Sequence, residues 1–184
     1  VVILSAPSGS GKTTLARHLL SIEKLNFKFS VSATTRKKRD HEINGKDYFF
    51  FSQEEFKNSI DNQDFIEYEK VYEDMYYGTL KSEVNNLIVN HNIVFDVDVI
   101  GALSLKKYFK SLSISIFIKP PSIDILEKRL IDREKNDPSE IKERVGKAEI
   151  EMKKEADFDS VIINEDLDVA KQELIYKVEN FLKW

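Results

Sequence analysis

A glycine- and serine-rich stretch near the start of the chain has the residue types that suit phosphate binding. Residues 6–13 read APSGSGKT. Gly9 and Gly11 have no Cβ, so the backbone can curl there and direct several N–H groups at phosphate oxygens. Lys12 could reach the β- and γ-phosphates of a nucleotide, and the Thr13 hydroxyl could ligate Mg²⁺.

The surroundings of this stretch favour a P-loop over the alternative, a chance Gly/Ser turn. An apolar run precedes it and an amphipathic pattern follows it, as the motif requires, so a helix dipole would face the phosphates. One difference is Ala6, which stands where the motif usually has its first glycine.

A second candidate is Asp96, which ends the apolar run at 93–95. The pattern resembles a Walker B strand, which delivers a carboxylate beside the metal of a P-loop. An apolar strand ending in aspartate is common, so the pattern gains weight only beside the P-loop. We expect Thr13 and Asp96 to ligate the metal, the latter directly or through water.

An α/β fold would position these residues. Short β-branched runs alternate with helical patterns, which is typical of a mostly parallel sheet core flanked by helices. The expected strands are 1–4, 93–95, 113–118 and 161–163, and the expected helices are 13–23, one beginning after Ser122, and 167–182.

Two stretches interrupt this alternation and are expected to form flaps on the core. Residues 30–78 are aromatic and hairpin-like, with candidate antiparallel strands at 48–51 and 65–71. Between them, Ser52 and Glu55 form a predicted capping box for a helix over 53–60. The second stretch, 135–155, is highly charged, and a helix start is indicated at 137–140.

Composition excludes several classes of protein. The 184 residues carry 28 Lys and Arg against 32 Asp and Glu, a net charge of −4, which disfavours a partner such as a long nucleic acid. There is no cysteine, and the three histidines are far apart, so thiolate chemistry and a histidine-rich metal site are disfavoured. No leader or apolar run of membrane-spanning length is visible, so we expect a cytoplasmic protein that binds no membrane.

The segments FSVSATTRKKR at 29–39 and NGKDYF at 44–49 resemble the acceptor-binding segment of guanylate kinases. FIEY at 65–68, YYGT at 76–79, DVD at 96–98, IKPPS at 118–122 and NEDLD at 164–168 continue the resemblance in order to the C-terminal end. The resemblance implies a P-loop NTPase-type core that carries an acceptor flap and a helical lid. It also implies Mg²⁺-dependent transfer of the ATP γ-phosphate to GMP, giving ADP and GDP, in the recycling of GMP.

The residues that the resemblance assigns to GMP are chemically suited to it. Arginine forks bind phosphate bidentately, tyrosine hydroxyls can donate to the same phosphate, and Glu67 could accept both N1–H and N2–H of guanine. Adenine has no such donor pair, so a buried carboxylate would select guanine. The implied GMP-binding residues are Ser32, Arg36, Arg39, Tyr48, Glu67, Tyr77, Thr79 and Asp98. Read without the resemblance, the basic run would be a solvated surface or a nucleic-acid-binding patch, and Glu67 would be an edge-strand charge.

The resemblance also implies roles in ATP binding and catalysis. The implied ATP-binding residues are Ser8, Gly9, Ser10, Gly11, Lys12, Thr13, Thr14 and Asn164. The implied catalytic residues are Lys12, Arg39, Arg133 and Arg144. Arg129 lies on the same helix face as Arg133, and it could equally be a salt-bridged surface residue.

The expected organisation is one compact unit with three regions. The core comprises 1–30, 81–121 and 156–184, the GMP-binding region 31–80, and the lid 122–155. The chain differs from the usual family pattern at Glu134, Ile100 and the longer turn over 72–75. ATP and GMP are the expected partners, and the sequence leaves open a monomer or a homo-oligomer.

Three rival functions have specific weaknesses. A regulatory GTPase is suggested by the Asp-x-x-Gly pattern at 98–101, but the Asn-Lys-x-Asp string that reads guanine is missing. A guanylate-kinase-like scaffold domain typically has a degraded phosphate loop, whereas Lys12 and Thr13 are intact here. Another small-metabolite P-loop kinase is disfavoured by Ser32, Glu67 and Thr79.

Overall fold

The centre of the protein is a parallel β-sheet. A computed structural model describes residues 1–72, 74–133 and 138–183. Within these ranges the core sheet has the order β2-β7-β1-β8-β9, and every neighbouring pair runs parallel. Its strands are β1 (Val2–Ser5), β2 (Phe27–Phe29), β7 (Asn92–Val97), β8 (Ile114–Lys119) and β9 (Ser160–Ile163). The predicted parallel-sheet α/β fold is therefore confirmed.

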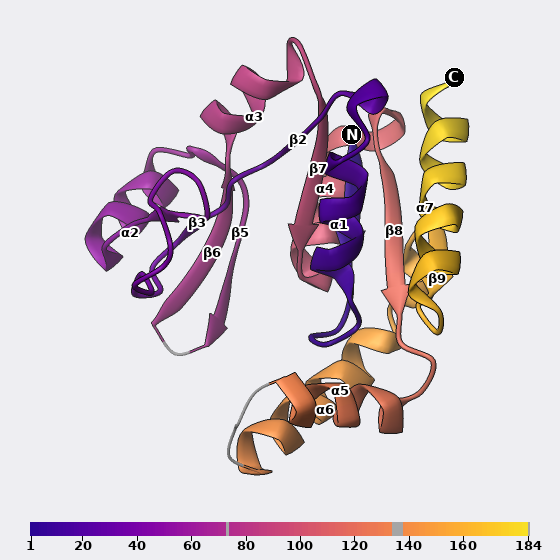
Figure 1. Ribbon diagram of the computed structural model, residues 1–184. Coiled ribbons are helices and arrows are strands. Elements are labelled where there is room, and N and C mark those ends of the chain that lie inside the picture. The colour runs from indigo at the N-terminus through magenta and orange to yellow at the C-terminus, as the bar shows by residue number, and fades with distance from the viewer. Residues whose placement is uncertain (73, 134–137, 184) are drawn as a thin grey trace.

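The middle strand β1 is buried on both faces because helices cover both. Val2 and Leu4 pack with Leu15 of α1 on one face, whereas Ile3 packs with Leu105 of α4 on the other. Figure 1 shows α1 in front of the core sheet and α4 behind it. The covering helices are α1 (Lys12–Leu20), α3 (Lys81–Ile88), α4 (Val99–Phe109) and α7 (Leu167–Leu182).

The first helix is shorter than predicted. It ends at Leu20, not at residue 23, because Ser21 closes its last turn: its backbone N–H and hydroxyl both donate to the carbonyl of His18. Short 3₁₀ turns follow this helix and two later elements: η1 (Glu23–Leu25), η2 (Lys110–Leu112) and η3 (Glu155–Asp157).

A second sheet, with strand order β4-β3-β6-β5, lies to one side of the core sheet (Figure 1). Its elements are β3 (Ala33–Thr34), β4 (Phe49–Phe50), β5 (Phe65–Tyr72), β6 (Met75–Leu80) and the packed helix α2 (Gln53–Asp61). The predicted capping box of Ser52 and Glu55 is confirmed at the start of α2. The predicted pairing of this region was wrong in part. Phe49 and Phe51 donate their N–H groups to the carbonyls of Ser32 and Thr34, so β4 runs parallel to β3, and β5 pairs antiparallel with β6.

A pair of helices lies beyond the carboxyl ends of the core strands, next to the loop that follows β1 (Figure 1). They are α5 (Ile123–Arg133) and α6 (Pro138–Met152). Ser122 caps α5 as predicted, because its hydroxyl accepts the N–H of Ile125 at 3.2 Å. Leu126 and Leu130 of α5 pack with Ala148 of α6. The predicted helix start at 137–140 depends on Asp137, which lies outside the described residues, as do Glu134 and Glu73 of the 72–75 turn.

None of the helices in the described ranges is both long enough and apolar enough to span a bilayer.

Candidate active site

The loop between β1 and α1 has the backbone geometry of a phosphate cradle. Gly9 and Gly11 have φ angles of 91° and 89°, in the region that favours glycine. A Cβ on Gly9 would come within 3.1 Å of Leu130, and one on Gly11 would overlap the amide nitrogen of Asn164. The backbone angle therefore favours glycine at both positions, and the overlap with Asn164 is a second reason for glycine at position 11.

Lys12 and Thr13 begin α1 and face the end of β7. The ammonium of Lys12 lies 2.8 Å from a carboxylate oxygen of Asp96 and donates to the carbonyl of Val97 at 2.6 Å. The hydroxyl of Thr13 donates to the other oxygen of Asp96 at 2.9 Å. The structure thus brings together the P-loop and Walker B residues that the sequence singled out. Asp96 and Thr13 supply oxygen donors of the kind Mg²⁺ prefers.

Asn164 follows β9 and supports the P-loop from behind. Its side chain is buried, and its amide nitrogen donates to the carbonyl of Ser10 at 2.7 Å. The backbone carbonyl of Asn164 accepts a hydrogen bond of 3.0 Å from the guanidinium of Arg129 on α5. Arg129 is therefore tied to the loop region, and an ion pair with an acidic surface residue is not needed to explain its position. The predicted role of Asn164 in binding ATP stays a prediction.

The remaining P-loop residues have different surroundings. Ser8, Thr13 and Thr14 are exposed, whereas Ser10 is fully buried. Exposed hydroxyls at the mouth of the loop are accessible to a bound nucleotide.

Three of the predicted phosphate ligands meet on the second sheet. The guanidinium of Arg36 lies 5.3 Å from the centre of the Tyr48 ring, and the rings of Tyr48 and Tyr77 are 5.9 Å apart, edge to face. Desolvation raises the pKa of Tyr48, so its hydroxyl stays protonated and can donate to an anion. Arg39 belongs to the same loop, where its side chain is exposed. A dianion beside these groups would meet two arginines and two phenols.

The predicted guanine-binding carboxylate is half-buried on β5. Glu67 accepts a 2.5 Å hydrogen bond from the hydroxyl of Thr79 on the paired strand β6. Burial raises the pKa of Glu67 to about 7, the nearby charge of Asp98 adds to the rise, and the Thr79 hydrogen bond opposes it. The carboxyl is thus fixed in orientation and titrates near neutral pH.

Asp98 lies just past the end of β7, between the P-loop and Glu67. It caps α4 by accepting the N–H of Gly101 at 2.8 Å. Oxygens of Asp98 and of Glu67 each lie 3.1 Å from the position that a Cβ on Gly101 would occupy. Two residues earlier, Asp96 contacts Lys12 and Thr13. The residues at the end of β7 therefore lie beside both the P-loop and Glu67, the carboxylate predicted to bind guanine.

The other predicted residues are placed as follows. Ser32 precedes β3 and is half-buried. Arg144 lies on α6 and is half-buried. The backbone of Arg133 ends α5, and its side chain lies outside the described residues. The roles of all three stay predictions.

Several acidic residues of this site were not predicted from the sequence. Glu42 is buried in the loop between β3 and β4, where it pairs with Arg36. Glu69 has a pKa raised by burial and by its hydrogen bond with Asp98, and Glu151 of α6 has a pKa raised mainly by burial. The only available signal was that Glu42 is acidic within a basic run, and nothing in the pattern indicated its burial.

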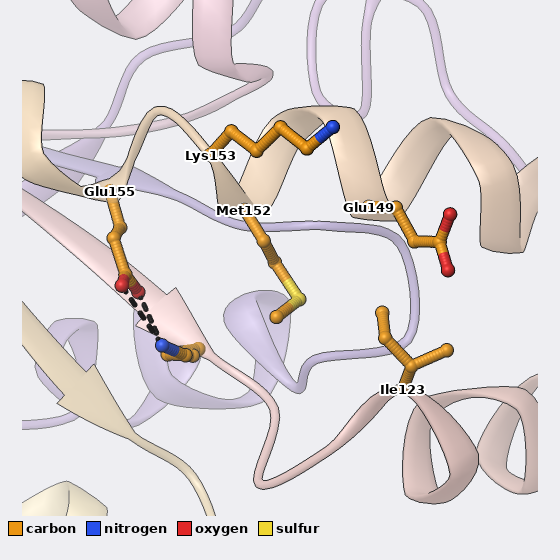
Figure 2. A pocket seen from close by; sticks show the side chains of 6 residues that line it. Ile123, Glu149, Met152, Lys153 and Glu155 are labelled. Carbon is orange, nitrogen blue, oxygen red and sulfur yellow. Dashed lines mark hydrogen bonds and ion pairs between the residues drawn. The ribbon is translucent and has the colours of Figure 1, made fainter.

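A hollow of about 460 Å³ lies apart from the predicted binding residues (Figure 2). It is bounded by Ile123 at the start of α5 and by Met152 near the end of α6, whose side chain points into it. Lys119 and Glu155, which also line the hollow, form an ion pair of 2.7 Å. This hollow lies at the base of the α5–α6 pair and contains no residue predicted to bind nucleotide.

Comparisons with known proteins agree with this geometry. Residues 1–181 match the family model described as guanylate kinase. The chain belongs to the guanylate kinase family. It is 49% identical to "Guanylate kinase" of Bacteroides fragilis over 99% of this chain and 89% of that protein, and 45% identical to "Guanylate kinase" of Porphyromonas gingivalis over 99% and 97%. The fold is similar to the crystal structure of guanylate kinase from Anaplasma phagocytophilum. That comparison has a TM-score of 0.78 at 29% identity and covers 98% of this chain and 84% of the other.

The family assignment confirms the predicted fold and activity. Guanylate kinases phosphorylate GMP with ATP, and the parallel sheet flanked by helices is the P-loop NTPase architecture that the resemblance implied. The rival interpretation as another small-metabolite kinase is excluded by the match over nearly the whole chain.

Proposed function

We propose that this guanylate kinase uses Mg²⁺ with ATP and that the residues around the end of β7 carry out transfer to GMP. The observation that supports these roles best is the spacing of Asp96 and Asp98. One contacts Lys12 and Thr13 of the P-loop, and the other lies beside Glu67. The donor phosphate and the acceptor base would thus bind on either side of the end of β7, at positions two residues apart. This arrangement suits direct transfer between two bound nucleotides.

The acceptor half would hold GMP at both of its ends. Glu67, held by Thr79, would accept the two adjacent N–H groups of guanine, with Ser32, Thr79 and Asp98 completing the base contacts. Arg36, Arg39, Tyr48 and Tyr77 would bind the phosphate. Fixing both ends orients one phosphate oxygen for attack, which lowers the entropic part of the barrier.

The donor half would hold the triphosphate of ATP. The N–H groups of the P-loop and the ammonium of Lys12 would neutralise its oxygens, and Thr13 and Asp96 would hold Mg²⁺. That ion supplies further charge neutralisation at the transferring phosphate. A GMP phosphate oxygen then forms a bond to the γ-phosphorus as the bond to the β–γ bridging oxygen breaks, and ADP leaves. No covalent enzyme intermediate is needed.

We also infer that residues 31–80 and 122–155 close over the two nucleotides. The first region carries the GMP-binding residues and the second carries Arg133 and Arg144, which would complete the charge around the transferring group. Arginines in that position accelerate phosphoryl transfer by ~10³–10⁵. Closure would also exclude water and so suppress hydrolysis of ATP. A cytoplasmic location remains a prediction.

The test is to follow both products from MgATP and GMP. ADP and GDP should appear in equal amounts, and omission of GMP or of Mg²⁺ should nearly abolish ADP formation. Lys12→Ala and Arg39→Ala should each reduce kcat/KM by at least a hundredfold while the melting temperature stays within a few degrees. Near wild-type kinetics in either variant would contradict the assigned roles. Absence of ATP binding by calorimetry would instead favour the non-enzymatic scaffold.

A further inference from the structure

Glu42 is a buried carboxylate within an otherwise exposed loop. Residues 37–47 are exposed at every position except this one, where only 7% of the residue is accessible. Burying a carboxylate is costly unless it is paired and hydrogen-bonded. Glu42 meets both conditions with two neighbours, Arg36 and Arg39, which are the arginines expected to bind the phosphate of GMP.

Three N–H groups converge on this carboxylate. Arg36 donates from Nη2 to Oε1 at 2.6 Å and from Nη1 to Oε2 at 3.0 Å, which makes a bidentate pair. The backbone N–H of Arg39 donates to Oε2 at 2.7 Å. The hydrogen bond with Arg36, followed by the one from Arg39, lowers the pKa of Glu42 to about 2. The carboxylate is therefore charged throughout the neutral range.

The pairing with Glu42 occupies one end of the Arg36 guanidinium. A guanidinium has five N–H groups. Both of those on Nη1 are used, one by Glu42 and one by the carbonyl of Lys37 at 2.8 Å, and one on Nη2 is used by Glu42. The other two, on Nε and Nη2, lie on the side edge of the fork. The plane is held by the rings of Tyr48 and Phe50, whose centres are 5.3 and 5.6 Å away.

We propose that Glu42 is a positioning residue for the acceptor phosphate: it occupies the end of the Arg36 fork, so that the side edge of Arg36 is the one offered to GMP. Its negative charge repels an anion from the occupied end. The hydrogen bond to the backbone of Arg39 fixes the second arginine relative to the first. Glu42 would thus set the spacing and orientation of both phosphate ligands without touching the substrate. This inference rests on the proposed role of Arg36 and Arg39 in binding the phosphate.

The chain offers a matched control in Asp47. Its carboxylate also accepts a backbone N–H in the same loop, that of Ile43 at 2.7 Å, but it is exposed and contacts neither arginine. Glu42→Gln and Asp47→Asn each remove one negative charge and leave the side chain nearly the same size. General disorder of the loop would affect both variants, whereas loss of arginine positioning would affect only the first.

The experiment compares steady-state constants and melting temperatures of both variants and of Glu42→Asp. We expect Glu42→Gln to raise KM for GMP at least tenfold and to leave KM for ATP within twofold of wild type. Glu42→Asp, which keeps the charge, should recover part of the loss, and Asp47→Asn should behave as wild type. An unchanged KM for GMP in Glu42→Gln, or an equal rise in Asp47→Asn, would overturn the proposal. If Glu42→Gln does not fold, the same comparison is decided by Glu42→Asp, whose shorter side chain should raise KM for GMP severalfold.

A double-mutant cycle tests whether Glu42 acts through Arg36. Lysine cannot form the bidentate pair, so adding Glu42→Gln to Arg36→Lys should change KM for GMP by less than threefold. If the fold-change in KM for GMP of the double variant equals the product of the two single fold-changes, Glu42 acts independently of Arg36. That result would contradict the proposal. Failure of the wild-type protein to phosphorylate GMP would contradict the proposed function itself. If the wild type phosphorylates GMP and Glu42→Gln has the same KM for GMP, this inference alone is contradicted.

Discussion

The side-chain amide of Asn164 donates a 2.7 Å hydrogen bond to the carbonyl of Ser10, 154 positions earlier in the chain. This contact joins the loop after the last core strand to the loop after the first. Because Arg129 donates to the carbonyl of Asn164, the contact also links the P-loop to α5. The shape of the phosphate cradle therefore depends on a residue far from it in sequence.

Replacing Asn164 with alanine should weaken ATP binding by loosening this cradle. The carbonyl of Ser10 would lose a buried donor, which costs about 1–3 kcal/mol. We expect a lower melting temperature and a rise in KM for ATP, with KM for GMP changed less than threefold. Both substrates should be varied in the same assay. A selective rise in KM for GMP would show that the residue does not act through the P-loop.

Gly11→Ala should impair the same loop for two separable reasons. Alanine at a φ of 89° is strained by about 1–3 kcal/mol, and its Cβ would overlap Asn164. Combining Gly11→Ala with Asn164→Ala removes the overlap and leaves the strain. Chemical denaturation should therefore show that the double variant is more stable than the sum of the two single effects predicts. Simple additivity would mean that backbone strain alone explains the loss.

The raised pKa of Glu67 predicts a pH dependence of GMP use. Only the ionised carboxylate can accept both N–H groups of guanine, so kcat/KM for GMP should fall up to tenfold per unit as the pH drops below about 7. The GMP phosphate also titrates in this range, so Glu67→Gln is the control. It should have a low kcat/KM and lose the part of the pH slope that Glu67 causes. An identical slope in both proteins would assign the whole effect to the substrate.

The same ionisation should lower stability as the pH rises. Between about pH 4.5 and 7 the folded protein keeps a proton on Glu67 that the unfolded chain releases, so the contribution of this group to stability decreases across that range. At pH 8, the free energy of unfolding of Glu67→Gln should exceed that of wild type by on the order of 2 kcal/mol. The variant should therefore unfold at a higher denaturant concentration. A less stable variant would show that the charged form of Glu67 is favoured in the folded protein.

Local patterns were sufficient to predict much of the fold. The apolar runs around Ile3, Phe95 and Phe117 are strands because parallel strands buried on both faces read as continuous apolar segments. The capping box at Ser52 was predictable because both of its partners lie within one turn. The pairing of β4 with β3 was not predictable from periodicity, because two-residue strands carry too few residues to indicate a partner.

In the site as well, local features were predictable from the sequence and long-range contacts were not. The P-loop and its pairing with Asp96 follow from residue types and from the apolar strand that precedes each of them. Burial and long-range contacts do not, so neither the pairing of Glu42 with Arg36 nor the contact of Asn164 with Ser10 could be predicted from spacing. The resemblance to guanylate kinases identified residues that could touch a nucleotide, and it said nothing about the residues that hold them in place.

The most direct test of the account is a comparison of acceptors at saturating MgATP. We predict that kcat/KM for GMP exceeds that for IMP, which has no 2-amino group, at least tenfold, and that AMP, UMP and dTMP are phosphorylated at least a thousandfold less efficiently. Equal turnover of GMP and AMP, or no turnover of GMP, would contradict the central claim that the Glu67 carboxylate selects guanine for phosphoryl transfer.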